Sequence, residues 1–166
     1  MNLNIENGKG KAEVKYITLF ALVFLVLGFF SSLLTGGTEL YGQFNNPPLS
    51  PPPVVFGIAW SVLYTLIGGV TGAVYSYLGK EYDPNIKSGL TYSFVGIILN
   101  YLWFPLYFGR GELIAALLDI IIILVLNIAC TVSFYKIKAV YGYLLIPYSI
   151  WLVFAAYLNL GTLLIN

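Results

Sequence analysis

Tryptophans and their neighbours at helical spacing are the side chains of this sequence that could act together on a ligand. Trp60 and Tyr64 are four residues apart. A second set, spaced i, i+4 and i+7, consists of Trp151, Ala155 and Leu158. Such spacings place residues on one face of a helix. Indole rings stack on flat ligands, and a small residue beside them leaves room for one. This pattern predicts either a pocket for a flat ligand or a packed aromatic core, and spacing alone leaves both interpretations open.

Other kinds of site are excluded by composition. The chain has no His and one Cys, Cys130, which lies in an apolar run. A Cys/His metal site, an internal disulfide and a His-dependent triad are therefore ruled out, and we expect no metal and no cofactor. A net charge of +1 argues against nucleic acid as a partner.

Polar side chains inside apolar stretches are the next candidates. Asp119 is the one acid well inside such a stretch. If this stretch crosses a membrane, as predicted below, a charge inside it costs about 3 kcal/mol. We therefore expect Asp119 to face the other helices, a partner or water. The alternatives are that it reaches the interface or is protonated. Three amides, Asn100, Asn127 and Asn159, could tie helices together, an interpretation that suits Asn127 better than the other two.

The elements that carry these residues are predicted to be membrane helices. Hydrophobic residues make up 59% of the 166 positions and charged residues 9%, against about 25% charged in soluble domains. A helix that crosses the bilayer needs about 20 apolar residues. The chain is thus predicted to be an all-α integral membrane protein, a single domain (1–166) that forms a five-transmembrane-helix bundle. The predicted spans are 16–34, 54–78, 88–108, 113–135 and 140–165.

Lysines predict the orientation of the five spans. Seven basic residues fall on one side and Arg110 alone on the other; the seven are Lys9, Lys11, Lys15, Lys80, Lys87, Lys136 and Lys138. Basic residues favour the cytoplasmic side, so the amino terminus is expected in the cytoplasm and the carboxyl terminus outside. The sequence has no Arg/Ser-rich leader, which favours a prokaryotic plasma membrane over an organelle.

Two further segments have a structural signature. Residues 35–53 form a loop with five prolines in its last seven positions, which predicts either a stiff connector or a lid over a cavity. Gly68 and Gly72, like Gly89 and Ser93, are small residues four apart. They predict close helix contacts, inside the bundle or between subunits.

Three separate blocks of the sequence resemble the translocator-protein family, also called tryptophan-rich sensory proteins or TspO/MBR. Residues 40–64 read LYGQFNNPPLSPPPVVFGIAWSVLY, which is similar to the family's Tyr, Pro-x-Trp-x-Pro-Pro and Trp-x-x-Leu-Tyr pattern. Residues 99–108 read LNYLWFPLYF and resemble its Leu-Asn-x-x-Trp motif. Residues 144–159 resemble its Pro-Tyr-x-x-Trp…Ala…Leu-Asn motif. The chain departs from the family at Asn46, Leu49 and Val54, where a basic residue and two tryptophans are usual, and it lacks the carboxyl-terminal sterol motif.

The resemblance implies a homodimeric five-helix protein that binds porphyrins, haem and other flat hydrophobic ligands in a pocket closed by the first loop. The residues it would place at the ligand are Tyr41, Pro52, Trp60, Tyr64, Asn100, Trp103, Leu118, Asp119, Ile122, Trp151, Ala155 and Leu158. With no His or Cys in that pocket, a metal-free porphyrin fits better than ligated haem.

Three functions follow as hypotheses. The first is a binding or transport protein, of sensor type, for tetrapyrroles. The second is an enzyme that breaks down protoporphyrin in light; no catalytic residue is established, and Trp60 and Trp151 would take part because the resemblance implicates them. The third is a structural or partner-binding membrane protein whose aromatic interior is packing.

Overall fold

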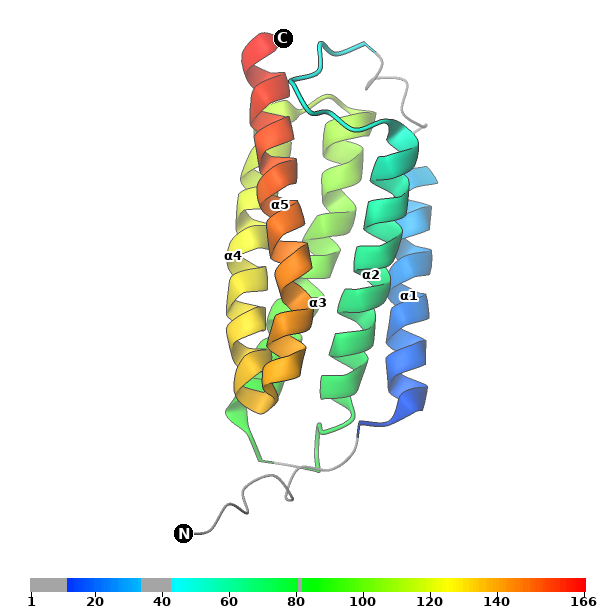
Figure 1. Ribbon diagram of the computed structural model, residues 1–166, viewed down its shortest axis with the longest axis vertical. Coiled ribbons are helices and arrows are strands. Elements are labelled where there is room, and N and C mark those ends of the chain that lie inside the picture. The colour runs from blue at the N-terminus through cyan, green and yellow to red at the C-terminus, as the bar shows by residue number, and fades with distance from the viewer. Residues whose placement is uncertain (1–11, 34–42, 81) are drawn as a thin grey trace.

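The described part of the chain is a bundle of five long helices (Figure 1). The computed structural model describes residues 12–33, 43–80 and 82–166. The helices are α1 (Val14–Leu33), α2 (Pro53–Tyr75), α3 (Pro84–Phe104), α4 (Leu113–Ile137) and α5 (Ala139–Ile165), and a π-helical turn, η1 (Pro105–Gly109), continues α3. All five are long and apolar enough to cross a membrane, so the fold class predicted from the sequence is confirmed.

Local chemistry sets several of the helix ends. Pro53 opens α2 and Pro84 opens α3, both at the first turn, where a missing N–H costs nothing. The carboxylate of Asp83 accepts a hydrogen bond from the N–H of Asn85 at 2.9 Å and caps α3. This cap explains why α3 begins at residue 84, four residues before the predicted span 88–108. Between α4 and α5 a single extended residue, Lys138, makes the turn.

The helices form a ring in the order α1, α2, α5, α4, α3. α1 packs mainly on α2, and α4 packs on both α3 and α5. Every helix has large apolar side chains on the outside; examples are Leu22, Ile58, Ile98, Ile121 and Ile150, each between 46% and 65% exposed. In water such a surface would be unfavourable, whereas in a bilayer it meets acyl chains.

Glycines bring α1 and α2 into backbone contact. A Cβ atom on Gly68 would lie 2.8 Å from the Cα of Ala21, and one on Gly72 would lie 2.9 Å from the Cα of Ile17. The pair of small residues predicted for close approach therefore acts inside the bundle. Gly89 lies against the ring of Phe134, and Ser93 bonds the hydroxyl of Thr71 at 2.6 Å, so these residues also serve packing within one chain.

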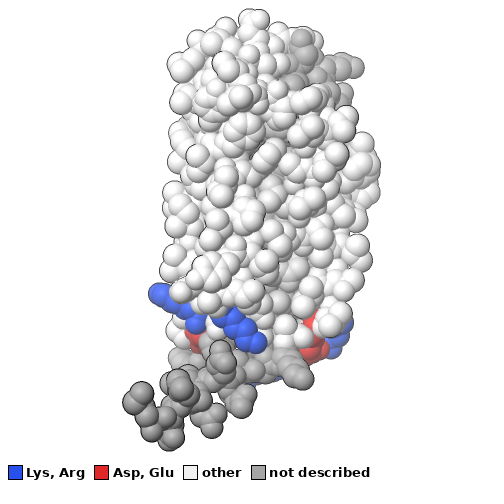
Figure 2. Space-filling model, viewed as in Figure 1, with Lys and Arg blue, Asp and Glu red and all other residues white. Residues whose placement is uncertain are grey.

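Charged side chains gather at one end of the face shown in Figure 2. The described lysines all belong to the end where α1, α3 and α5 begin, and they are Lys15, Lys80, Lys87, Lys136 and Lys138. Arg110 follows η1 at the opposite end. At the lysine end, Glu13 pairs with Lys80 and, at 2.8 Å, with Lys15. The start of α1 is thereby tied to the segment that follows α2.

Candidate ligand-binding site

A cavity of about 730 Å³ opens between α1, α2 and the end of α3. It lies in the half of the bundle away from the lysines, because it uses the last residues of α1 and the first of α2. Its walls are formed by Leu25, Val26, Gly28, Phe29, Ser32, Leu33, Pro53, Phe56, Gly57, Trp60, Ser61, Tyr64, Phe104 and Phe108.

The packing of α1 explains where the cavity begins. In the lysine half, Gly68 and Gly72 let the backbones of α1 and α2 touch, so no space remains there. One level further along, Gly28 of α1 lies directly against the ring of Tyr64. Beyond this contact α2 carries Gly57, whose missing Cβ would meet no atom within 4 Å. The helices are thus tightly packed on one side of Tyr64 and separated on the other.

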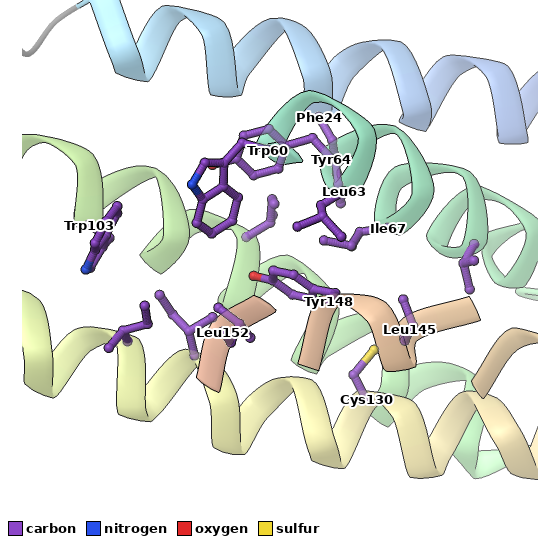
Figure 3. Close-up of a cluster of buried hydrophobic side chains, with 14 of the residues drawn as sticks. Phe24, Trp60, Leu63, Tyr64, Ile67, Trp103, Cys130, Leu145, Tyr148 and Leu152 are labelled. Carbon is purple, nitrogen blue, oxygen red and sulfur yellow. The ribbon is translucent and has the colours of Figure 1, made fainter. Parts of the chain in front are cut away.

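Trp60 is the central ring of an aromatic cluster beside the cavity (Figure 3). Its ring stacks on Tyr64 at a centroid distance of 5.3 Å and an interplanar angle of 27°. Trp103 and Trp151 both lie 6.2 Å away, the latter nearly perpendicular at 87°. Trp60 therefore has one side toward the cavity and the other toward the closed interior of the bundle, where Figure 3 shows Tyr148.

Buried asparagines hold this cluster in place. Tyr64 donates its hydroxyl hydrogen to Oδ1 of Asn100 at 2.5 Å, and Nδ2 of Asn100 donates to the hydroxyl of Tyr148 at 3.0 Å. Trp103 donates from Nε1 to Oδ1 of Asn159 at 3.3 Å. Asn159 in turn donates to the carbonyl of Leu113 at 2.9 Å. Each amide thus links three helices or their ends. Helix tying, the interpretation that the sequence favoured less for these two residues than for Asn127, describes both of them here.

Three buried polar atoms in the same half of the bundle have no hydrogen-bond partner in the described structure. They are Nε1 of Trp60, Nε1 of Trp151 and Oδ2 of Asp119. Asp119 is 7% exposed, so it faces the bundle, as expected for the one acid inside a span. Unpaired buried polar groups are costly and commonly mark places where a ligand or water binds.

The structure brings only some of the predicted ligand residues to the cavity. Trp60 and Tyr64 line it, whereas Asn100 and Trp103 lie behind them in the core. Trp151 is half-buried, with Phe56 at 5.5 Å and Phe154 at 5.5 Å, and is not part of the cavity wall.

The remaining predicted residues lie elsewhere. Ala155 and Leu158 are buried in α5, away from the cavity wall. Leu118 and Ile122 are 58% and 50% exposed, so these two residues face outward on α4 and do not join Asp119 inside. Pro52 is exposed just before α2, and Tyr41 lies outside the described residues.

The sequence analysis missed the wall that α1 provides. Leu25, Val26 and Phe29 line the cavity, yet α1 is apolar on all sides and has no period that marks an inner face. Phe56 and Phe108 were also not singled out. The sequence of α2 does indicate the cavity: Pro53, Gly57 and Ser61 are spaced four residues apart, so one face of this helix carries only small side chains.

The described part of the proline-rich loop, residues 43–52, packs over the end of α5 (Figure 1). Tyr157 donates to the carbonyl of Pro48 at 3.0 Å, and Asn45 and Asn166 exchange two hydrogen bonds of 2.9 and 3.0 Å. Pro47 fits against Gly161, where a Cβ would lie 2.6 Å from the proline ring. The rest of the predicted lid, residues 34–42, is outside the described residues.

Chemically, the site offers aromatic faces and apolar surface. Within residues 12–33, 43–80 and 82–166, no cluster of His, Cys, Asp or Glu could hold a metal ion. Among the described residues of the cavity wall, the phenol of Tyr64 is the one ionisable group. This arrangement suits binding of a flat or flexible apolar molecule.

Comparison with known proteins gives one consistent result. The TspO/MBR family matches residues 19–164. Protein CrtK of Rhodobacter capsulatus is 30% identical over 153 residues, which cover 90% of this chain and 94% of CrtK. The tryptophan-rich protein TspO of Archaeoglobus fulgidus is 34% identical over 147 residues, covering 87% and 93%. The translocator protein of Sus scrofa is 32% identical over 144 residues, covering 84% and 83%.

Proposed function

The chain belongs to the TspO/MBR family, and from that premise we propose that it binds a metal-free porphyrin or a similar flat hydrophobic molecule beside Trp60. The observation that carries this proposal is the cavity of about 730 Å³ with an indole in its wall. Its volume falls within the range of about 300–1,000 Å³ found for small-molecule sites. Relatives are named translocator or sensory proteins, which suits binding coupled to movement or signalling.

The side chains around the cavity support a flat apolar ligand. Trp60 and Tyr64 are stacked on each other, so an ordered pair of aromatic rings lines the cavity. Further rings in the wall are Phe56, also on α2, and Phe104 and Phe108 at the end of α3 and in η1. The wall contains neither of the common axial ligands of haem iron, His and Cys, which favours a porphyrin without iron.

A titration with protoporphyrin in the dark tests this proposal, with quenching of tryptophan fluorescence as the signal. Gly57→Phe places a ring in the cavity at a position where Cβ meets no atom. The matched control is Ile58→Phe, on the next position of α2, which is 61% exposed and outside the cavity wall. We expect saturable quenching that Gly57→Phe weakens by tenfold or more, about 1.4 kcal/mol, and that Ile58→Phe leaves unchanged.

Two other results would contradict the proposal, the first for the location of the ligand and the second for porphyrin binding itself. Saturable binding that survives Gly57→Phe but disappears in Trp151→Phe would place the ligand in the interior near α5. Absence of saturable quenching in the parent protein would remove porphyrin binding and leave the aromatic cluster as packing.

Breakdown of the bound porphyrin in light is a second candidate function. It is favoured by one observation, the contact of Trp60 in the cavity wall with the rings of Trp103 and Trp151 at 6.2 Å. Illumination of the same complex separates the two functions. Loss of porphyrin absorbance that depends on Trp60 or Trp151 supports an enzyme, and stable absorbance supports binding alone.

The orientation in the membrane is also a proposal, with the lysine end in the cytoplasm. A cysteine at Tyr82, which is fully exposed at that end, should react with a membrane-impermeant maleimide only in inverted vesicles. A cysteine at Leu49, 80% exposed at the other end, should react in intact cells. The homodimer implied by the family remains a proposal too, and it needs a surface other than Gly68 and Gly72, which α1 already covers.

A further inference from the structure

The cavity opens sideways through the outer surface of the bundle. Three of its residues on α1 are exposed: Val26 (46%), Phe29 (61%) and Leu33 (57%). On the opposite rim, Gly57 and Ser61 of α2 are exposed as well. All these residues belong to the two membrane-spanning helices Val14–Leu33 and Pro53–Tyr75. The surroundings of this opening are therefore the hydrocarbon of the bilayer.

The described residues of the cavity wall offer almost no free hydrogen-bonding group. Ser32 donates its hydroxyl hydrogen to the carbonyl of Phe29 at 2.7 Å, and Ser61 donates to that of Gly57 at 2.8 Å. The hydroxyl of Tyr64 is engaged by Asn100 at 2.5 Å. Nε1 of Trp60 is buried and has almost no accessible surface. A ligand in the cavity therefore meets hydrocarbon, aromatic rings and hydroxyl oxygens whose hydrogens are already donated within the protein.

Water is a poor occupant for such a space. A water molecule is stable inside a protein when two to four polar groups bind it, and a cavity without them stays dry. An acyl chain of a neighbouring lipid keeps its van der Waals contacts when it enters, because it exchanges contacts with other chains for contacts with apolar side chains. The size of the cavity, about 730 Å³, and its opening on the lipid side suit a chain that remains attached to its headgroup.

We propose that an acyl chain of a bilayer lipid occupies the cavity between α1 and α2 and lies against Trp60 when no other ligand is bound. A flat ligand then enters from the bilayer and displaces this chain. The inference concerns the cavity itself and does not depend on porphyrin as the ligand, so each proposal can fail while the other stands.

Depth in the membrane makes the proposal measurable. Trp60 is seven residues from the start of α2 at Pro53, which is about 10 Å along a helix with a rise of 1.5 Å per residue. Half the hydrocarbon thickness is about 15 Å, so the indole lies at the level of the middle of an acyl chain. Bromine atoms at mid-chain quench indole fluorescence at contact distance and can report the chain in the cavity.

The experiment uses the full-length protein in vesicles of phosphatidylcholine, with or without two bromines at mid-chain, and without porphyrin. One variant keeps Trp60 as its only tryptophan (Trp103→Phe, Trp151→Phe), and the matched variant keeps only Trp103. Both indoles are 2% exposed, but only Trp60 lines the cavity. We expect the bromines to remove most of the Trp60 fluorescence and little of the Trp103 fluorescence.

Filling the cavity separates an internal chain from bulk lipid. Gly57→Phe and, independently, Ser61→Leu should restore most of the Trp60 fluorescence in brominated vesicles. Ile58→Phe, which faces lipid outside the cavity, should not. Equal quenching of Trp60 and Trp103, or quenching of Trp60 that neither cavity-filling variant reduces, would overturn the proposal.

Discussion

The contact between α1 and α2 makes a sharp prediction for two glycines that are three residues apart. Gly72 faces the backbone of α1: a Cβ there would lie 2.6 Å from the carbonyl carbon of Tyr16 and 2.9 Å from the Cα of Ile17. Gly69 is on the same helix, but its Cβ would meet only the Cγ2 atom of Ile17 at 3.7 Å, an ordinary contact. The substitution to alanine should therefore have opposite effects at the two positions.

The magnitudes follow from packing and helix propensity. Backbone atoms cannot rotate away, so Gly72→Ala must push α1 from α2, and overpacking of this kind costs about 1–3 kcal/mol. Gly69→Ala meets no clash and gains up to about 1 kcal/mol of helix propensity. For a chain of 166 residues, 1 kcal/mol corresponds to about 2–4 °C in Tm. We expect Gly72→Ala to lower Tm by about 2–12 °C and Gly69→Ala to leave it unchanged or raise it slightly.

The chain contains its own reporter for this measurement. Cys130 is its single cysteine and is 2% exposed. A thiol-reactive fluorogenic dye therefore reports unfolding in detergent micelles without any engineered label. Gly68→Ala, which would meet the Cα of Ala21 at 2.8 Å, serves as an independent repeat of the Gly72 result. Equal Tm shifts for Gly69→Ala and Gly72→Ala would refute the backbone contact between α1 and α2.

Three further predictions concern other contacts. Asn100→Leu leaves the hydroxyls of Tyr64 and Tyr148 without their amide partner, so it should lower the free energy of unfolding by about 1–3 kcal/mol in the same dye assay. Asn127→Leu loses one hydrogen bond, to Ser149 at 2.8 Å, and should lower the free energy of unfolding by about 0.6 kcal/mol. Gly161→Ala should displace Pro47 and speed chymotrypsin cleavage after Phe44, while Gly57→Ala should not; unchanged cleavage would argue against packing of residues 43–52 on α5. The hydrogen bond from Lys15, together with that from Lys80, holds the pKa of Glu13 below its usual 4.5, so the stabilisation from this pair is present above pH 4.5 and is lost as pH falls through the lowered value. Glu13→Gln should remove that pH dependence from Tm, and a parallel pH profile in the variant would contradict it.

The number and order of the helices could be predicted from the sequence because each span is a long apolar run separated by Pro, Gly or charge. For Asn100 and Asn159 the sequence left open whether the amide ties helices or meets a ligand; an amide inside the bilayer needs a partner, and in the structure each of them has two. Gly68 and Gly72 could be predicted as a close contact, but not which helix they would meet.

The inner and outer faces of the helices could not be predicted in the same way. In a membrane both faces are apolar, so hydropathy carries no period that separates them. Leu118 and Ile122 illustrate the difficulty: they flank Asp119 in sequence, yet they face lipid while Asp119 faces inward. The position of the cavity depends on where α1 diverges from α2 beyond Gly28, a feature of packing that no single residue encodes.

The ring of helices consists of two units, and the helices within each unit share more contacts than the two units share with each other. α1 and α2 pack along each other, and α4 joins α3 and α5, while contacts between the two sets are sparser. These sparser contacts include the aromatic rings around Trp60 and hydrogen bonds such as Tyr64 to Asn100. The first two helices can therefore pair as a hairpin while the ribosome is still translating the other three. We expect docking of the two units to come last in biogenesis, with Phe56 and Trp60 in contact with lipid until then.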